Sequence, residues 1–275
     1  MDWWQALVLG IVQGLTEFLP VSSSGHLVLM RNLIGADGEG FLDFTVAVHF
    51  ATVMSTIVVF RKEILALLKG LFKFRYNDET DYVCKILVSM IPVGVVGLFF
   101  KDRVEALFGT GVTVVGVCLL ITAVLLLLSD VLTAVVRYEN NYRNGISYWQ
   151  ALLVGIGQAF AVAPGLSRSG TTIATGLISG VKRDKMAQFS FLMVLIPIIG
   201  EQLLDCMDLV LSPAESAGAS FVGVVPIVIG VVSAFLCGLF ACRVMVSLVR
   251  KARMKWFALY CAVVGIAVLT VGFIG

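Results

Sequence analysis

The sequence predicts an all-α polytopic membrane protein, with six transmembrane helices and two re-entrant helical hairpins in an inverted-topology repeat. Three observations lead to this fold class: an apolar composition, an internal repeat and an uneven distribution of Lys and Arg. Apolar residues make up 59% of the 275 residues and charged residues 14%, against about 45–50% and about 25% in soluble domains. The composition therefore indicates a protein in contact with the lipid bilayer. The net charge of +2 and the absence of a basic run interleaved with aromatic residues give no support for a nucleic-acid partner.

Six segments are apolar over enough residues to cross a bilayer as helices, which takes about 20 residues. They are 42–60, 86–100, 112–129, 186–204, 217–241 and 256–274. Two further apolar segments, 3–30 and 148–180, are interrupted in the middle by Pro, Gly and Ser. Because these residues end helices, each segment is predicted to form two short helices around a break. The polar segments 61–85 and 130–147 are predicted to be connections.

The two interrupted segments resemble one another. "WQALVLGIVQGLTEFLPVSSSGHL" at 4–27 aligns without a gap with "WQALLVGIGQAFAVAPGLSRSGTT" at 149–172, and ten of 24 positions are identical at an offset of 145. Such self-similarity indicates a duplicated structural unit. We therefore predict one integral membrane domain, in which each repeat is a re-entrant hairpin followed by three spans. The first repeat is 1–130 with hairpin 3–30, the second is 148–275 with hairpin 148–180, and 131–147 is a cytoplasmic connection.

The positions of Lys and Arg indicate how the repeats are oriented, because loops rich in these residues stay in the cytoplasm. Basic residues concentrate in 61–85 and 243–255, whereas the 201–215 connection contains four acidic residues and no basic one. If the chain crosses the membrane six times, the basic segments all lie in the cytoplasm only if each interrupted segment returns to the side from which it entered. Segment 3–30 then enters from outside and 148–180 from the cytoplasm. Inverted repeats with broken helices commonly form a polar site where their halves meet.

Polar residues cluster at the two breaks, in "TEFLPVSSSGH" at 16–26 and "APGLSRSGTT" at 163–172. A charge inside a membrane costs at least about 2.5–3.5 kcal/mol, so Glu17 and Arg168 each need a partner or a function. The planar guanidinium of Arg168 suits phosphate. On the facing repeat, Glu17, the serines and His26 could act as acid, nucleophile and base. This combination favours phosphoryl transfer.

Each of these residues also has a structural interpretation, since serines and glycines at helix breaks are often caps and turns. A helix that begins near Ser22 would direct its N–H groups toward a bound anion. Ser23 and His26, three residues apart, would share one face of that helix and present a hydroxyl and a base to one phosphorus atom. His49 stands alone in the apolar segment 42–60 and is expected to have a packing role.

The motifs "QGLTEFLPVSSSGH" at 13–26 and "PGLSRSGTT" at 164–172 resemble those of the bacterial undecaprenyl-pyrophosphate phosphatases of the bacitracin-resistance type. The length, the repeat and the order of spans agree over nearly the whole chain. The resemblance implies an enzyme of the bacterial plasma (inner) membrane. It would hydrolyse undecaprenyl pyrophosphate to undecaprenyl phosphate and inorganic phosphate, so that the lipid carrier is reused in peptidoglycan synthesis. It also implies a divalent cation, Mg²⁺ or Ca²⁺, and an active site toward the outer, periplasmic face.

The resemblance assigns roles to the motif positions. Gln13 and Glu17 match a pair implicated in handling metal and pyrophosphate, with Glu17 as the metal ligand and the only acid of the motif. The residues that match those tied to catalysis are Ser22, Ser23 and His26. The residues that match the phosphate-binding group are Ser167, Arg168 and Thr172, to which Ser169 adds a hydroxyl. The nucleophile stays open between Ser23, His26 and an activated water molecule.

Transport is the competing function class, because inverted repeats with re-entrant hairpins are also a transporter architecture. A lipid-phosphate flippase or an ion-coupled transporter would use the same cavity. Such a carrier needs the arginine but not a nucleophile and a base opposite it. A homodimer is compatible with the sequence, which leaves the oligomeric state open.

Overall fold

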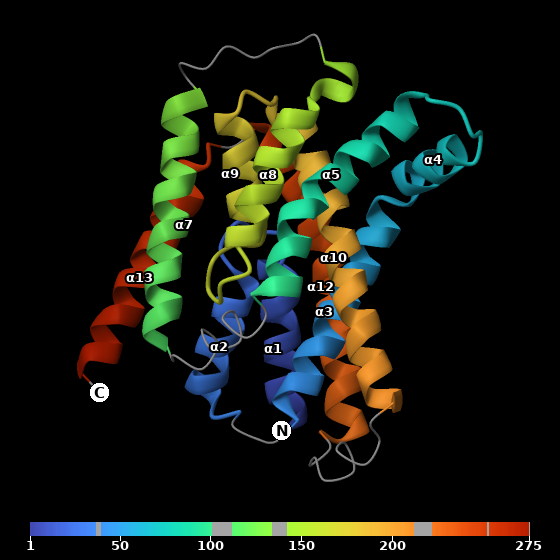
Figure 1. Ribbon diagram of the computed structural model, residues 1–275. Helices are drawn as coiled ribbons and strands as arrows, with labels where there is room; N and C mark the ends of the chain where they lie inside the picture. The colour runs from blue at the N-terminus through green and yellow to red at the C-terminus, as the bar shows by residue number, and fades with distance from the viewer. Residues whose placement is uncertain (37–39, 101–111, 134–141, 212–221, 252, 275) are drawn as a thin grey trace.

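The protein is a bundle of helices in the computed structural model, which describes all residues except 37–39, 101–111, 134–141, 212–221, 252 and 275 (Figure 1). The described residues form no β-strand, as expected for the predicted all-α class. In chain order the elements are α1 (Trp3–Thr16), α2 (Ser23–Ile34), α3 (Phe41–Val59), α4 (Arg61–Leu71), α5 (Asp78–Phe99), α7 (Val112–Thr133), the 3₁₀-helix η1 (Arg143–Gly145), α8 (Tyr148–Phe160), α9 (Arg168–Ile178), α10 (Arg183–Leu211), α12 (Val224–Lys251) and α13 (Lys255–Ile274).

Each interrupted segment forms two helices around a break, as predicted. The breaks separate α1 from α2 and α8 from α9. The second helix of each pair begins after a serine cap at equivalent repeat positions. Ser22 and Ser167 each accept a hydrogen bond from the N–H three residues later, at 3.2 Å and 3.0 Å. In Figure 1 the α1–α2 pair lies in the lower half of the bundle and the α8–α9 pair in the upper half, and residues of both breaks line one cavity.

Among the described residues, three helices are long and apolar enough to cross a membrane: α5, α7 and the Val224–Val249 part of α12. A fourth candidate is α3 taken together with α4, whose axes differ by 74°. A shorter apolar helix, Lys255–Val271, lies within α13. These findings support an all-helical membrane protein.

The predicted spans fall on long helices wherever the chain is described. The described helices that overlap the predicted spans are, in chain order, α3, α5, α7, α10, α12 and α13. The start of the predicted span 217–241 lies outside the described residues. Pro92 lies inside α5, which begins eight residues before the predicted span 86–100.

The prediction that 61–85 is a connection is wrong in most of its length. Residues 61–71 form α4, and α5 already begins at residue 78. Asn77 joins the two helices: its side chain accepts a hydrogen bond from the Thr80 N–H at 2.8 Å and donates one to the Gly70 carbonyl at 2.9 Å. The many basic residues of 61–85 suggested a loop, although its leucines recur at helical spacing.

Close helix contacts fix the first break relative to α3. Both α1 and α3 pack against α12, and α9 packs against α7. Gly14 allows α1 to approach α12, because a Cβ there would lie 2.6 Å from the carbonyl oxygen of Ala234. The Ser55 hydroxyl of α3 donates to the carbonyl of Phe235, also on α12, at 2.8 Å. The end of α1 and the middle of α3 are therefore held against one helix and face the same space.

Candidate active site

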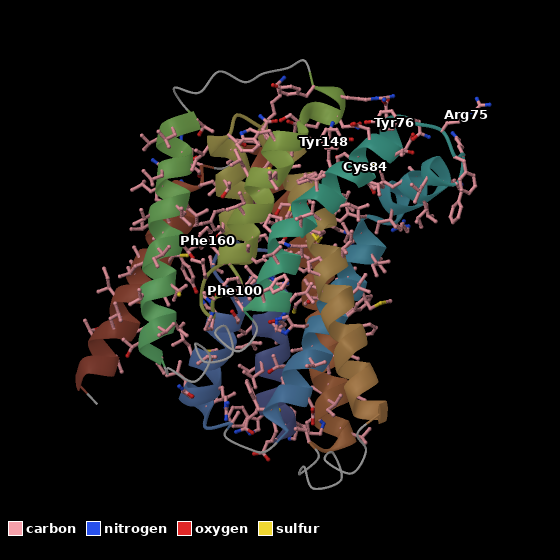
Figure 2. The ribbon with its side chains drawn as sticks, in the orientation of Figure 1. Arg75, Tyr76, Cys84, Phe100, Tyr148 and Phe160 are labelled. Atoms are coloured by element: carbon pink, nitrogen blue, oxygen red, sulfur yellow. The ribbon has the colours of Figure 1, made fainter. Side chains whose placement is uncertain are left out.

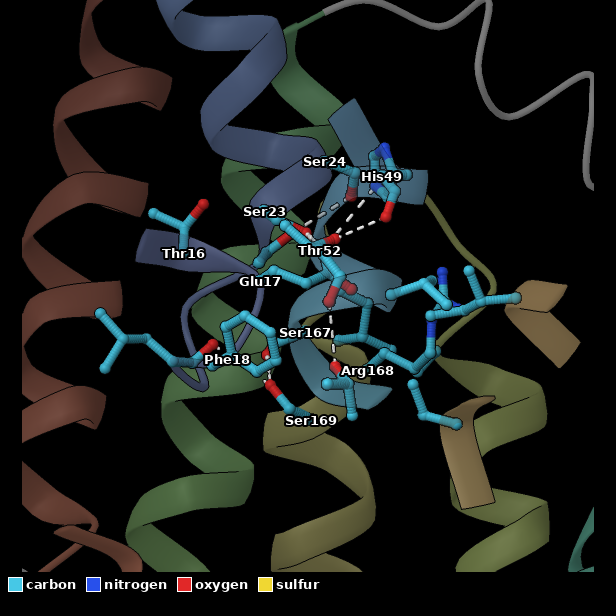
Figure 3. Close-up of a pocket in the computed structure, with 18 of the residues that line it drawn as sticks. Thr16, Glu17, Phe18, Ser23, Ser24, His49, Thr52, Ser167, Arg168 and Ser169 are labelled. Carbon is cyan, nitrogen blue, oxygen red and sulfur yellow. Dashed lines mark hydrogen bonds and ion pairs between the residues drawn. The ribbon is translucent and has the colours of Figure 1, made fainter. Parts of the chain in front are cut away.

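A cavity of about 270 Å³ lies where the two breaks meet. Residues 16–19, 22–24, 161–164 and 166–169 line it, together with residues of α3 and α10. Figure 3 shows Glu17, Ser23, His49 and Arg168 gathered around this space. Apolar side chains also line it, among them Val46, Val53, Val194, Leu195 and Ile198. The cavity therefore suits an amphiphilic ligand with a charged head group and an apolar chain.

Glu17 follows the last residue of α1, and one of its carboxylate oxygens meets side chains of three helices. Its Oε2 accepts hydrogen bonds from Gln13 Nε2 at 2.9 Å and from the Ser23 hydroxyl at 2.5 Å. His49 Nε2 of α3 lies 3.7 Å from the same oxygen. No described residue donates a hydrogen bond to the other oxygen, Oε1. The predicted pair of Gln13 and Glu17 is thus in contact, and Glu17 keeps one oxygen for a ligand.

Ser23 is the first residue of α2, and its hydroxyl donates to Glu17 across the break. A hydroxyl–carboxylate distance of 2.5 Å is that of a strong, charge-assisted hydrogen bond. The preceding residue, Ser22, has a φ of 70°, which is uncommon for a residue other than glycine. This left-handed turn starts α2 so that its first side chain reaches the end of α1. Glu17 is therefore placed to take the Ser23 proton.

Arg168 occupies in the second repeat the position that Ser23 occupies in the first, as the first residue after the break. It lines the cavity, and no described residue accepts a hydrogen bond from its guanidinium. Within the described chain, the N–H groups of the first two residues of α2 and of α9 also have no acceptor. Helix N-termini with free N–H groups bind anions. Two such termini and one arginine are therefore chemically suited to a phosphate-like group.

The other residues of the second motif hold this site together. The Ser169 hydroxyl donates to the carbonyl of Leu19 in the first repeat at 3.2 Å. Thr172 is fully buried, and its hydroxyl lies 2.7 Å from that of Ser190. Ser167, Ser169 and Ser190 line the cavity, whereas Thr172 is not among the described lining residues. Thr172 therefore acts on the cavity through Ser190, a residue that the motifs did not indicate.

His26 is turned away from the cavity. Its Nδ1 lies 2.7 Å from the carbonyl oxygen of Ser22, and its Nε2 lies 2.7 Å from the hydroxyl of Tyr260 on α13, whose ring stacks on the imidazole. It is not among the described residues that line the cavity. The expectation that Ser23 and His26 present a hydroxyl and a base to one phosphorus atom is therefore wrong in this structure. His26 stabilises the turn at Ser22 and so positions Ser23.

His49, for which a packing role was predicted, is the histidine among the described residues that line the cavity. Its Nδ1 lies 2.9 Å from the carbonyl oxygen of Thr45, so this nitrogen carries a proton and donates. Its Nε2 then faces Glu17. Sequence reasoning missed this residue because nothing in its own segment shows which side of α3 meets the first break.

A divalent cation fits this site only together with a ligand. Glu17 is the only carboxylate among the described residues that line the cavity. The described residues also contain no group of three or more His, Cys, Asp or Glu side chains suited to a metal ion. Glu17 Oε1 and the nearby hydroxyls are oxygen donors, which Mg²⁺ and Ca²⁺ prefer, and Mg²⁺ is often bound by one or two carboxylates plus substrate phosphates. The donor set therefore fits a cation shared with a phosphate ligand.

The chain is similar to known proteins over almost all of its length. The profile of the family described as bacitracin resistance protein BacA matches residues 6–267. A Bacteroides thetaiotaomicron protein named undecaprenyl-diphosphatase is 50% identical over 272 residues, which covers 98% of both chains. Proteins of the same name from Bacteroides fragilis and Carboxydothermus hydrogenoformans are 50% and 37% identical, covering 98% of this chain in both cases and 98% and 97% of theirs. This chain belongs to the bacitracin resistance protein BacA family.

Proposed function

We propose that this protein hydrolyses undecaprenyl pyrophosphate to undecaprenyl phosphate and inorganic phosphate, which returns the lipid carrier to cell-wall synthesis. One observation carries the proposal: a single cavity holds a hydrogen-bonded Ser23–Glu17 pair and an arginine whose guanidinium donates no hydrogen bond to a described residue. The shared name of the relatives supports it. A flippase or ion-coupled transporter is not supported, because a carrier needs Arg168 but not the serine–carboxylate pair.

The arrangement of the cavity suggests how each group takes part. The pyrophosphate binds to Arg168 and to the free N–H groups at the starts of α2 and α9. Ser23 Oγ attacks the terminal phosphorus as Glu17 accepts its proton, and the bond between that phosphorus and the bridging oxygen breaks. Undecaprenyl phosphate leaves with the bridging oxygen and receives the proton. Water, deprotonated by Glu17, then releases inorganic phosphate from Ser23, whose oxygen takes the proton back.

Direct attack by a water molecule that Glu17 deprotonates would give the same products in one step, with Ser23 orienting the carboxylate. A divalent cation held by Glu17 and the substrate phosphates would neutralise charge on the pyrophosphate. The apolar side chains of α3 and α10 in the cavity wall would contact the first isoprene units of the lipid.

We also propose the finer arrangement in the membrane: six spans and two re-entrant hairpins in an inverted repeat, in the bacterial inner membrane, with the cavity open to the outer face. Two observations support this arrangement: the breaks occur at equivalent positions of the two repeats, and the α1–α2 and α8–α9 pairs lie in opposite halves of the bundle (Figure 1). In a variant without native cysteines, an impermeant thiol reagent added outside should label a cysteine at Gly35 and not one at Asn144. Labelling of Asn144→Cys from outside would contradict this orientation.

Phosphate release from undecaprenyl pyrophosphate by the purified protein tests the activity, and Arg168→Lys tests the anion site. The substitution keeps the charge but removes the planar fork that binds two phosphate oxygens. We expect turnover to fall at least about tenfold, or roughly 1.4 kcal/mol in the activation free energy. The matched control is Lys182→Arg, an exposed position outside the cavity. Near wild-type turnover in Arg168→Lys would remove Arg168 from the site.

His49→Ala tests whether the histidine beside Glu17 contributes. Removing the imidazole leaves Glu17 without the neighbour that lies 3.7 Å from its Oε2, so the carboxylate is less well oriented toward Ser23. We expect turnover to fall roughly tenfold, or about 1.4 kcal/mol. Thr45→Val is the control, because it alters the same wall of the cavity but keeps the backbone carbonyl that His49 binds. Equal turnover of the two variants would return His49 to a packing role.

A further inference from the structure

Helix α4 has the side-chain pattern of a helix that lies along a membrane surface. Leu65, Leu68 and Phe72 follow one another at spacings of three and four, so they share one side. Lys62 and Lys69, seven residues apart, share an adjacent side. A strongly amphipathic helix with Lys on its polar side and Leu or Phe on the other is typical of helices that lie in the interface between water and lipid.

The direction of α4 also fits that location. It begins directly after α3 and turns by 74° from the α3 axis. In Figure 1 it extends outward from the bundle at the end of α3. If α3 crosses the bilayer, a turn of this size lays α4 close to the plane of the membrane.

Contacts with α5 hold α4 in this direction. Gly70 packs so closely against α5 that a Cβ there would lie 2.3 Å from the side chain of Glu79. The Asn77 side chain bridges the two helices through the Gly70 carbonyl. Tyr76, in the turn after α4, donates to Asp81 at 2.8 Å, and its hydroxyl lies 2.9 Å from that of Tyr148 on α8 (Figure 2). The orientation of α4 is therefore set by packing.

The outward side of α4 is left uncovered by the described residues. Leu65 is 53% exposed, Phe72 70% and Phe74, in the following turn, 90%. Elsewhere on the described chain, exposed apolar residues occur on α5, α7 and α12, which are long and apolar enough to cross a membrane, and also on α1, α8 and α10. On α4 they occur beside exposed basic residues, namely Arg61, Lys62, Lys69, Lys73 and Arg75, with Glu63 as the only acid in 61–75. This combination of side chains suits the surface of a membrane, where negatively charged head groups cover apolar acyl chains.

We propose that α4 lies in the head-group layer of the cytoplasmic leaflet and binds anionic phospholipids. Leu65, Leu68 and Phe72 enter the boundary of the acyl chains, while Lys62, Lys69 and Lys73 contact the negatively charged head groups. Juxtamembrane basic segments are attracted to anionic lipids in this way. The excess of Lys and Arg in 61–85 places the helix on the cytoplasmic side. The binding surface is therefore separate from the cavity that the two breaks form.

Hydrogen exchange of the full chain in vesicles tests this proposal. The protein is reconstituted in phosphatidylcholine vesicles and in vesicles with equal parts of phosphatidylcholine and phosphatidylglycerol, and amide exchange is followed for residues 61–73. We expect exchange to be at least about tenfold slower with phosphatidylglycerol, and the difference to shrink at high salt, because the attraction is electrostatic. The triple variant Lys62→Glu, Lys69→Glu, Lys73→Glu is expected to lose the difference.

A second triple variant controls for net charge: Lys182→Glu, Arg253→Glu, Lys255→Glu. These residues are exposed, lie outside α4 and change the net charge by the same amount, so the protection of α4 by phosphatidylglycerol is expected to persist. Loss of protection in both variants, or no effect of phosphatidylglycerol on the wild type, would overturn the proposal. So would protection that disappears when the protein is diluted in excess lipid, because a second protein molecule would then be what covers α4.

Discussion

Replacing Ser23 with alanine is expected to reduce turnover at least about 10³-fold, or roughly 4 kcal/mol in the activation free energy, because removing a covalent nucleophile leaves only the effects of binding and charge stabilisation. Binding of undecaprenyl pyrophosphate should persist, since Arg168 and the helix N-termini are unchanged. The two quantities are measured separately, as phosphate release under saturating lipid and as equilibrium binding of the lipid to the purified protein.

Ser24→Ala is the matched control for this experiment. Ser24 also lines the cavity, one residue further along α2, but its hydroxyl lies near that of Ser22 at 3.4 Å and does not reach Glu17. Its loss should change turnover by less than about fivefold, or roughly 1 kcal/mol. If Ser23→Ala instead turned over as fast as Ser24→Ala, a water molecule activated by Glu17 would be the nucleophile and the phosphoserine step would be wrong.

Glu17→Gln is expected to lower turnover by about 10²–10⁴-fold, the range in which a positioned acid–base group contributes. Glutamine keeps the size of the side chain and can still meet Gln13 and Ser23, but it has no charge and does not accept the serine proton. The variant should also need a higher concentration of divalent cation for half-maximal activity, because Glu17 is the only carboxylate among the described lining residues.

A titration with Mg²⁺ and with Ca²⁺ separates the two roles of Glu17. The control is Gln13→Glu, which adds a carboxylate four residues away in the same helix and should restore part of the response to metal when it is combined with Glu17→Gln. A Glu17→Gln variant with reduced turnover but an unchanged dependence on metal would leave Glu17 as a base and remove it from the cation site.

Much of the local structure could be read directly from the sequence. The two breaks and the helices around them follow from Pro, Gly and serine caps, which act within a few residues, and the offset of 145 identified the matching positions of Ser22 and Ser167. The pairing of Gln13 with Glu17 follows from their spacing of four on one helix. Helix α4 was missed because its basic residues suggested a loop, although its apolar period predicts a helix.

The roles of the two histidines were decided by the tertiary structure alone. Ser23 and His26 lie on one turn of α2, yet Ser23 reaches back to Glu17 while His26 turns to Tyr260, a residue 234 positions away. His49 joins the site because α1 and α3 pack on α12, which brings two segments distant in sequence to the same cavity. The sequence by itself determined the composition, the repeat and the polar groups at the breaks, because these depend on residue type and short-range backbone preferences. The set of side chains that faces the cavity depends on how distant helices rotate against one another, and that rotation is fixed only when the whole bundle packs.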